Sequence, residues 1–187
     1  MSIKPPKILD TREVARSRIF TIEEVDLEFS NGEQRTYERF NSQGYQRGGM
    51  MVVPINANDE FVLLREYANG MDRYELNFPK GIIDPGEEPI VTANRELQEE
   101  AGFAAADIRA IKTVGISPSY MKNKMYFYVA QDLTPSQLEG DEPEPMEVVT
   151  WPVNDYKSLL AHEHFTGALS ISALFLALEK LGRLHVR

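Results

Sequence analysis

Hydrophobic and polar residues alternate from Arg18 onward, which is the pattern of a β-strand with one covered face. One slip in the alternation, at Glu23-Glu24, predicts a β-bulge. The residues before this strand are mixed in pattern and include two consecutive prolines, so we expect an extended lead-in over residues 1–17. The apolar positions of the strand are Phe20, Ile22, Val25, Leu27 and Phe29.

A hairpin turn follows this strand. Asn31-Gly32 is a two-residue turn signal, and residues 34–40 supply the returning strand. An isolated hairpin is marginally stable in water, so this one needs another surface to pack on. Three glycines within residues 42–49 mark a boundary after it. We therefore expect an N-terminal β-hairpin subdomain over residues 1–47 and a second domain over residues 48–187.

The second domain mixes strand and helix patterns. A turn at residues 56–60 separates its first two strands, and residues 133–145 are polar and proline-containing, which predicts a loop. Apolar runs predict strands at residues 50–55, 61–67, 74–78, 108–116, 124–130 and 148–151. Helical patterns occupy residues 154–163 and 168–181. The order of elements predicts a mixed sheet with flanking helices.

Another helix lies in the middle of the chain. It begins just after Pro85-Gly86 and ends at Gly102. On a helical wheel Glu96, Glu99 and Glu100 share an arc of roughly 100°. The neighbouring arc, which we expect to be buried, holds Ile90, Ala93, Leu97 and Ala101. One side of this helix therefore packs, and the next side presents three carboxylates.

Three carboxylates in one patch repel one another, by about 0.2–0.5 kcal/mol for each like-charged pair one turn apart. Arg95, one turn before Glu99, offsets part of this repulsion. A divalent cation offsets far more, because Mg²⁺ prefers oxygen ligands and usually binds a few carboxylates together with substrate phosphates. A solvated acidic helix face is the alternative.

Composition narrows the possible functions. The net charge of −9 argues against a nucleic-acid partner, which would need a basic surface. The chain has no cysteine, which excludes disulfides, thiol catalysis and thiolate metal sites. No apolar run of about 18 residues predicts a membrane span. We therefore expect a soluble, cytoplasmic protein whose small anionic substrate binds through a local cation.

The helix and the loop before it match the Nudix box, G-x5-E-x7-R-E-U-x-E-E-x-G-U, in which U is a bulky apolar residue. All of its fixed positions are filled, by Gly81, Glu87, Arg95, Glu96, Leu97, Glu99, Glu100, Gly102 and Phe103. So many fixed positions make a specific signal. The chain therefore resembles the Nudix hydrolase family. The resemblance implies an α/β/α sandwich with a mixed sheet, and hydrolysis of a nucleoside diphosphate joined to another group.

The resemblance also implies a metal site for two or three Mg²⁺ or Mn²⁺ ions. Metals held by clustered carboxylates neutralise a diphosphate and activate water. Arg95 is implied to orient Glu99, and Glu87 to contribute through a water molecule. The implied metal ligands are Glu96, Glu99, Glu100 and the backbone carbonyl of Lys80, with Glu99 and Glu100 also implied as catalytic.

In the ADP-ribose pyrophosphatase branch of this family, a glutamate on a loop after the box helps to activate water. The acidic loop at residues 139–145 stands at the matching place in this chain. We expect Glu142 to be the general base and Glu144 to be a supplementary metal ligand. A solvated acidic loop is the alternative, because acidic loops are common in a chain of this charge.

Candidate substrate contacts come from the same branch. Pro118 lies sixteen residues after Gly102, as in ADP-ribose-type members, and its loop also contains Tyr120, a candidate for adenine stacking. Arg65 is a candidate phosphate contact, with a surface ion pair as the alternative. Ala68 stands where the branch often has a second arginine, which argues against a tight contact with a terminal ribose.

Further stretches resemble those family members that hydrolyse ADP compounds. This resemblance implies ADP-ribose, NADH and short diadenosine polyphosphates as substrates and AMP as a product. It also implies a homodimer in which the N-terminal hairpin reaches across to the partner. The stretches are residues 14–18, 28–32, 65–67, 117–120 and 139–145.

Two other functions stay open. One is a non-catalytic Nudix-fold sensor of ADP-ribose or another nucleotide, although such modules can lose metal-binding glutamates and this chain keeps them. The other is a nucleoside triphosphate pyrophosphohydrolase, whose members generally lack the long N-terminal hairpin and Pro118. Release of pyrophosphate from a triphosphate distinguishes the last possibility.

Overall fold

The computed structural model describes residues 4–41, 48–140 and 142–184. The chain forms two compact units, one of residues 1–46 and 115–124 and the other of residues 47–114 and 125–187. The predicted glycine-rich boundary at residues 42–49 lies mostly outside the described residues.

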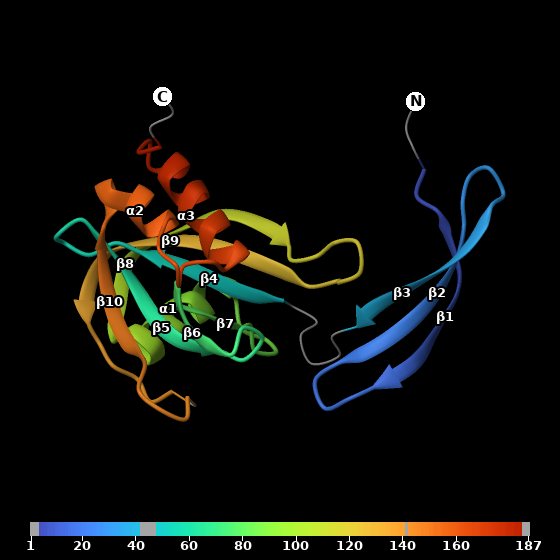
Figure 1. Ribbon diagram of the computed structural model, residues 1–187, viewed down its shortest axis with the longest axis horizontal. Helices are drawn as coiled ribbons and strands as arrows, with labels where there is room; N and C mark the ends of the chain where they lie inside the picture. The colour runs from blue at the N-terminus through green and yellow to red at the C-terminus, as the bar shows by residue number, and fades with distance from the viewer. Residues whose placement is uncertain (1–3, 42–47, 141, 185–187) are drawn as a thin grey trace. The chain divides into compact units, whose positions relative to one another are not determined.

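The N-terminal unit contains a three-stranded antiparallel sheet in the order β1-β2-β3 (Figure 1). Its strands are β1 (Lys7–Arg16), β2 (Thr21–Glu28) and β3 (Gln34–Asn41). The predicted hairpin is therefore present as β2 and β3, and the predicted lead-in is a third strand. All ten residues of β1 are exposed, so the strand has no alternation that a sequence pattern can reveal.

The bulge predicted at Glu23-Glu24 was wrong. The register between β2 and β3 runs through both residues without a shift. Both glutamates are accommodated by ion pairs, Glu23 with Arg39 at 2.9 Å and Glu24 with Arg12, so the strand needs no bulge. The register shifts lie instead between β1 and β2.

The turn of the hairpin has three residues, where the sequence predicted two. Phe29 and Glu33 close the loop, with a hydrogen bond from Phe29 N to Glu33 O of 2.9 Å. Gly32 N donates to Phe29 O at 2.9 Å, and Gly32 has a φ of 84°. This is the left-handed residue that a three-residue hairpin loop requires at its last position.

The second unit contains two sheets (Figure 1). One has the order β10-β5-β6 and is antiparallel; the other has the order β7-β4-β9-β8, with β4 antiparallel to β7 and parallel to β9. The strands are β4 (Gly49–Pro54), β5 (Glu60–Ala68), β6 (Arg73–Asn77), β7 (Lys80–Ile82), β8 (Phe103–Gly115), β9 (Lys124–Pro135) and β10 (Glu147–Pro152).

Three α-helices accompany these sheets: α1 (Pro89–Ala101), α2 (Tyr156–Leu160) and α3 (Ala168–Lys180). Both α1 and α3 pack on β4. The predicted α/β sandwich with a mixed sheet is confirmed. Strand β7 was not predicted, and the helix predicted at residues 154–163 is only a 3₁₀ turn (Val153–Asp155) followed by the short α2.

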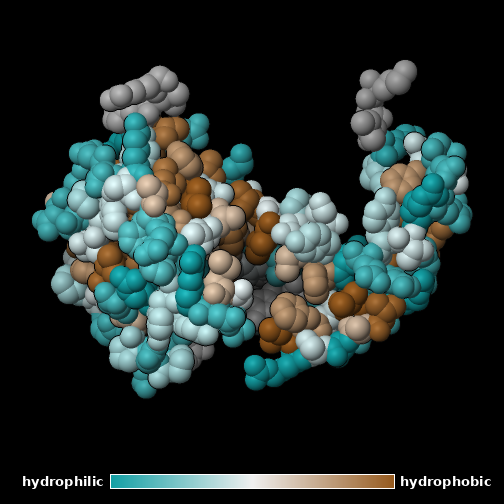
Figure 2. Space-filling view, viewed as in Figure 1, coloured by the Kyte–Doolittle hydropathy of each residue, from teal (hydrophilic) through white to brown (hydrophobic). Residues whose placement is uncertain are grey.

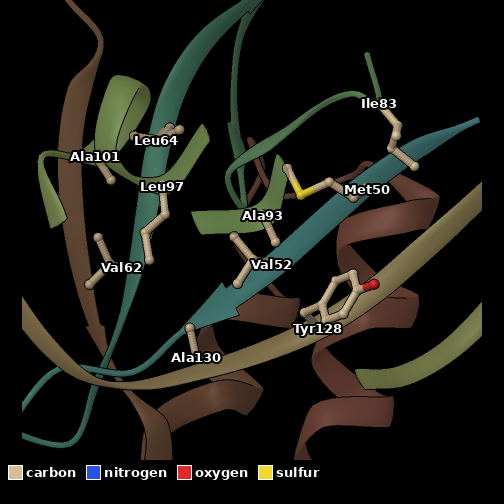
Figure 3. Close-up of a cluster of buried hydrophobic side chains, with 10 residues drawn as sticks. All are labelled: Met50, Val52, Val62, Leu64, Ile83, Ala93, Leu97, Ala101, Tyr128 and Ala130. Atoms are coloured by element: carbon tan, nitrogen blue, oxygen red, sulfur yellow. The ribbon is translucent and has the colours of Figure 1, made fainter. Parts of the chain in front are cut away.

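The core beside α1 joins this helix to three strands. Figure 3 shows Ala93 and Leu97 of α1 directed toward the strands that carry Val52 and Val62. Ile90, predicted on the buried arc, is instead 43% exposed, because it lies in the first turn of a helix that begins at Pro89. The buried cluster consists of Met50, Val52, Val62, Leu64, Ile83, Ala93, Leu97, Ala101, Tyr128 and Ala130.

The surface of the second unit is mainly hydrophilic in the view of Figure 2, with hydrophobic residues visible near α2 and α3. Among the described residues, no helix has the length and apolar character to cross a membrane. The N-terminal unit exposes several large hydrophobic side chains of its own, namely Ile8, Leu9, Val14, Ile19, Phe20 and Tyr37.

Candidate active site

Helix α1 is held between a short strand and a left-handed glycine. Pro89 starts it, and Gly102 ends it with a φ of 74°, donating its N–H to Leu97 O. Gly81 in β7 faces the carboxylate end of the helix, where a Cβ on this residue would overlap the Glu96 carboxylate. The glycine of the Nudix box therefore lets Glu96 lie directly against the β7 backbone.

Glu100 is a strongly perturbed carboxylate of this helix. Its Oε2 accepts a hydrogen bond of 2.9 Å from Lys80 N. Burial raises the pKa of Glu100 to about 8, against the favourable influence of Lys80, and the negative charges of Glu96 and Glu66 act in the same direction as burial. The protein alone thus leaves the negative charge of Glu100 poorly compensated.

Arg95 forms ion pairs with the other three glutamates of the Nudix box. Its Nη1 lies 2.7 Å from Glu99 Oε2 and 3.0 Å from Glu96 Oε1. Its Nη2 lies 3.3 Å from Glu87 Oε2, which also accepts a hydrogen bond of 2.7 Å from Thr92 Oγ1. Burial would raise the pKa of Glu87, but hydrogen bonds from Arg95 and Thr92 hold it below its usual value.

The acidic loop closes over the face of α1 that carries these carboxylates. A cavity of about 300 Å³ is lined by the three helix glutamates together with residues 137–140 and 142–146. A second cavity, of about 510 Å³, joins the same glutamates to Lys80, Gly81 and Glu142. Glu142 lines both cavities and Glu144 lines the first. The two loop glutamates expected from the sequence therefore share a cavity with the three on the helix.

Each end of the acidic loop is anchored. At the first end, Gln137 Nε2 donates to Glu99 O at 3.0 Å, and the next residue bonds to the backbone of α1. At the second end, Tyr74 Oη donates to Glu144 Oε1 at 2.6 Å, and Arg65 Nε lies 2.8 Å from Glu147 Oε2. These contacts hold the loop to α1 on one side and to β5 and β6 on the other.

The donors suit a hard divalent cation, although they do not converge as they lie. No group of three or more His, Cys, Asp or Glu side chains within the described residues is close enough to hold a metal ion. Glu96 and Glu99 turn toward Arg95, and Glu100 turns toward Lys80 N. Carboxylates on one helix face, lining one cavity and including one with a raised pKa, are the oxygen donors that Mg²⁺ prefers.

The residues predicted to contact substrate do not line these two cavities. Arg65 is paired with Glu147, which is the structural alternative considered for it, and it lines a further cavity beside the acidic loop. Pro118 and Tyr120 belong to the N-terminal unit, where Tyr120 packs edge-on against Phe40 with ring centroids 6.1 Å apart. Their contact with substrate stays a prediction.

Comparison with known proteins gives the family. A model described as the NUDIX domain matches residues 45–172, and a model described as the NudE-type Nudix hydrolase N-terminal domain matches residues 6–39. The chain belongs to the Nudix hydrolase family. Nudix hydrolases typically depend on a divalent metal.

Relatives of this Nudix hydrolase cover nearly all of the chain. The ADP compounds hydrolase NudE of Escherichia coli K12 is 51% identical over 96% of this chain and 95% of its own. The ADP-ribose pyrophosphatase of Bacillus subtilis 168 is 26% identical over 82% of this chain and 85% of its own. A crystal structure of an ADP compounds hydrolase superposes with a TM-score of 0.89 and 50% identity, over 98% of this chain and 100% of that one.

Sequence reasoning missed several side chains around this Nudix site. Lys80 was predicted only through its carbonyl, yet its ammonium group pairs with Glu66. Tyr67 and Tyr74 lie opposite each other on β5 and β6 and line the cavity beside the acidic loop. The register of a hairpin is the one signal that would have placed these tyrosines together.

Proposed function

We propose that this Nudix hydrolase cleaves the diphosphate bond of ADP-containing compounds, releasing AMP and a second phosphate product. The proposed substrates are ADP-ribose, NADH and short diadenosine polyphosphates. The observation that carries the proposal is the 51% identity, over 96% of the chain, to a relative named ADP compounds hydrolase. The cavity over the carboxylates of α1 supports it, because it supplies the place where a diphosphate and its cation would meet.

Two or three Mg²⁺ or Mn²⁺ ions are the proposed cofactors. Bound metal supplies charge neutralisation for the diphosphate and lowers the pKa of a bound water. Glu87 would contribute through a water molecule, in addition to its bonds with Arg95 and Thr92. The proposed direct ligands are Glu96, Glu99, Glu100, the Lys80 carbonyl and, as a supplement, Glu144.

The chain's own residues then hold the ligands and the base. Arg95 holds Glu99 and Glu96 from one side, and Gly81 leaves room for Glu96 against β7. Glu142 is the proposed general base, since it lines both cavities next to the helix glutamates. A positioned base typically contributes about 10²–10⁴-fold to a rate.

The N-terminal unit is proposed to form a homodimer. This unit exposes Ile8, Val14 and Phe20, each at 46% or more, and a three-stranded sheet needs a covered face. Replacing Ile8 and Val14 with Asp together is expected to give a monomer in analytical ultracentrifugation, whereas Asp10→Asn on the same strand leaves the dimer intact. A monomeric wild type would contradict the proposal.

The domain limits at residue 47 and the cytoplasmic location stay predictions.

A product assay tests the proposed activity. ADP-ribose, NADH, diadenosine triphosphate and dGTP are incubated with wild type and Glu100→Gln, with Mg²⁺ and with chelator. AMP is expected from the three ADP compounds only with Mg²⁺, and the variant is expected to lose most of this activity. Glu88→Gln is the matched control, because Glu88 is exposed at the start of the same helix and its side chain makes no capping hydrogen bond.

Other outcomes point to the alternatives. ADP-ribose that binds without being cleaved by any form would identify a sensor and contradict the hydrolase. Pyrophosphate from dGTP, with no AMP from the ADP compounds, would identify a triphosphate pyrophosphohydrolase.

A further inference from the structure

A cavity of about 500 Å³ lies beside the acidic loop, on the side away from α1, and its wall carries two tyrosines. Tyr67 of β5 and Tyr74 of β6 are directly opposite each other in the antiparallel register. Their ring centroids are 5.5 Å apart at an interplanar angle of 72°, and the residues are 49% and 44% exposed. Two large aromatic rings left in water at the rim of a cavity are available to pack against a further flat group.

This cavity is continuous in its lining with the candidate active site. Residues 142–146 line both the tyrosine cavity and the 300 Å³ cavity over the three helix glutamates. A diphosphate held against α1 and a group held against the tyrosines would therefore share these loop residues as a common wall. The group attached to that diphosphate is the one these rings would contact.

The charge of the cavity limits what this group is. Four carboxylates line it, against the single guanidinium of Arg65, which is already paired with Glu147 at 2.8 Å. A terminal phosphate would meet net negative charge there. A planar heterocycle that carries an amino or carboxamide group instead offers N–H donors to carboxylate oxygens. The carboxylates are Glu66, Glu142, Glu144 and Glu147.

We propose that Tyr67 and Tyr74 form a subsite for a planar nitrogen heterocycle, the base of the second nucleoside in a dinucleotide substrate. The inference rests on the proposed function and adds a source of selectivity to it. A dinucleotide gains stacking on the tyrosines, whereas an ADP-sugar, whose second group is a non-aromatic sugar, does not. Tyr74 also keeps Glu144 at the rim through its hydroxyl, so Tyr67 is the ring whose loss isolates stacking.

Steady-state kinetics with three substrates test the subsite. Wild type, Tyr67→Leu and Tyr67→Phe are compared on NADH, diadenosine triphosphate and ADP-ribose with Mg²⁺. Tyr67→Leu is expected to raise KM about tenfold for the two dinucleotides, in the range of one lost base–aromatic stack, while ADP-ribose changes less than twofold. Tyr67→Phe keeps a ring and is expected to retain the wild-type preference. Phe175→Leu, which removes a ring of similar exposure from α3, is the matched control.

A binding measurement in chelator separates this proposal from the proposed activity. NADH is titrated without metal and its own fluorescence is followed. Tyr67→Leu is expected to weaken NADH binding about tenfold, whether or not the wild type hydrolyses anything. Equal losses on ADP-ribose would assign the tyrosines to the shared adenosine and overturn the proposal. A fall in kcat on all three substrates at constant KM would assign them to loop positioning and overturn it as well. Wild type that cleaves none of the substrates, with NADH binding that still depends on Tyr67, contradicts the proposed function alone.

Discussion

Two glutamates, one buried and one partly buried, show how differently this chain treats a carboxylate. Glu75 on β6 is 3% exposed and is fully partnered by Arg73 Nε at 2.6 Å, Thr166 Oγ1 at 2.9 Å and Thr166 N at 3.2 Å. Burial would raise its pKa, but these partners hold the pKa below the ordinary 4.5. Glu100 has one backbone donor, and burial raises its pKa to about 8.

The difference separates a structural carboxylate from one that needs a ligand. Glu75 joins β6 to the segment before α3, and the protein supplies everything its charge requires. Around Glu100 the nearby charges include Glu96 and Glu66, which increase the cost of ionisation. A perturbed carboxylate in a cavity is a functional candidate for this reason. A divalent cation would compensate the negative charge of Glu100, as Arg73 and Thr166 compensate that of Glu75.

A large effect on activity is expected when the Glu96 carboxylate is displaced without changing its chemistry. Gly81→Ala places a methyl group where the Glu96 carboxylate lies, so the side chain must leave β7. We expect kcat/KM on ADP-ribose to fall about 100-fold, as for misplaced catalytic groups, with little change in stability. Steady-state kinetics and thermal unfolding check this. Gly70→Ala, a glycine with open space around it, is the control and should leave both unchanged. A Gly81→Ala enzyme with wild-type activity would show that the reaction does not require the Glu96 carboxylate in this position.

This part of the site was accessible from sequence because it is local. The box fixes the spacing of Gly81 and the glutamates along one strand, loop and helix, and in the structure Gly81 and the three helix glutamates line one cavity. Longer-range features were not accessible. Tyr74 meets Glu144 across seventy positions of the chain, and the Lys80–Glu66 pair joins β7 of one sheet to β5 of the other. β1 was missed because none of its residues is buried.

Glu75→Gln removes the structural carboxylate of β6. The change removes a buried charge from Arg73 and weakens the bond with Thr166, so we expect the free energy of unfolding to fall by about 2–3 kcal/mol at pH 7. Because the folded pKa of Glu75 is lowered, its stabilisation is present above pH 4.5 and is lost as the pH falls through the folded value. Urea unfolding at pH 7 and at pH 3 measures this. Glu179→Gln, a change at an exposed residue of α3, is the control. A deficit as large at pH 3 as at pH 7 would contradict the charge argument.

Glu100→Gln should have the opposite effect on the metal-free protein. A raised folded pKa means that ionised Glu100 costs stability at high pH; the cost is absent below 4.5, grows as the pH rises toward 8 and then levels off. In chelator the variant is therefore expected to be more stable than wild type by about 1–3 kcal/mol at pH 9 and equal to it at pH 4.5. Thermal unfolding at both pH values tests this. Wild type that is the more stable form at pH 9 would show that Glu100 is already compensated.

The smallest effect concerns the anchor of the acidic loop. Tyr74→Phe removes the 2.6 Å hydrogen bond to Glu144 and keeps the ring. We expect kcat on ADP-ribose to fall about two- to fivefold through a less ordered loop, within the value of a single hydrogen bond to a charged group. Tyr37→Phe, on the exposed N-terminal sheet, is the matched control. No change in kcat would show that the anchor at Arg65 and Glu147 holds the loop alone.

The most direct test of the account compares the two carboxylates in one assay. AMP release from ADP-ribose is measured with Mg²⁺ for Glu100→Gln and Glu75→Gln at a temperature where both are folded. We expect a loss of about 1,000-fold in kcat/KM for Glu100→Gln, the range of several kcal/mol of metal-assisted stabilisation, and of less than threefold for Glu75→Gln. Equal activities of the two variants would contradict the assignment of Glu100 to the metal site.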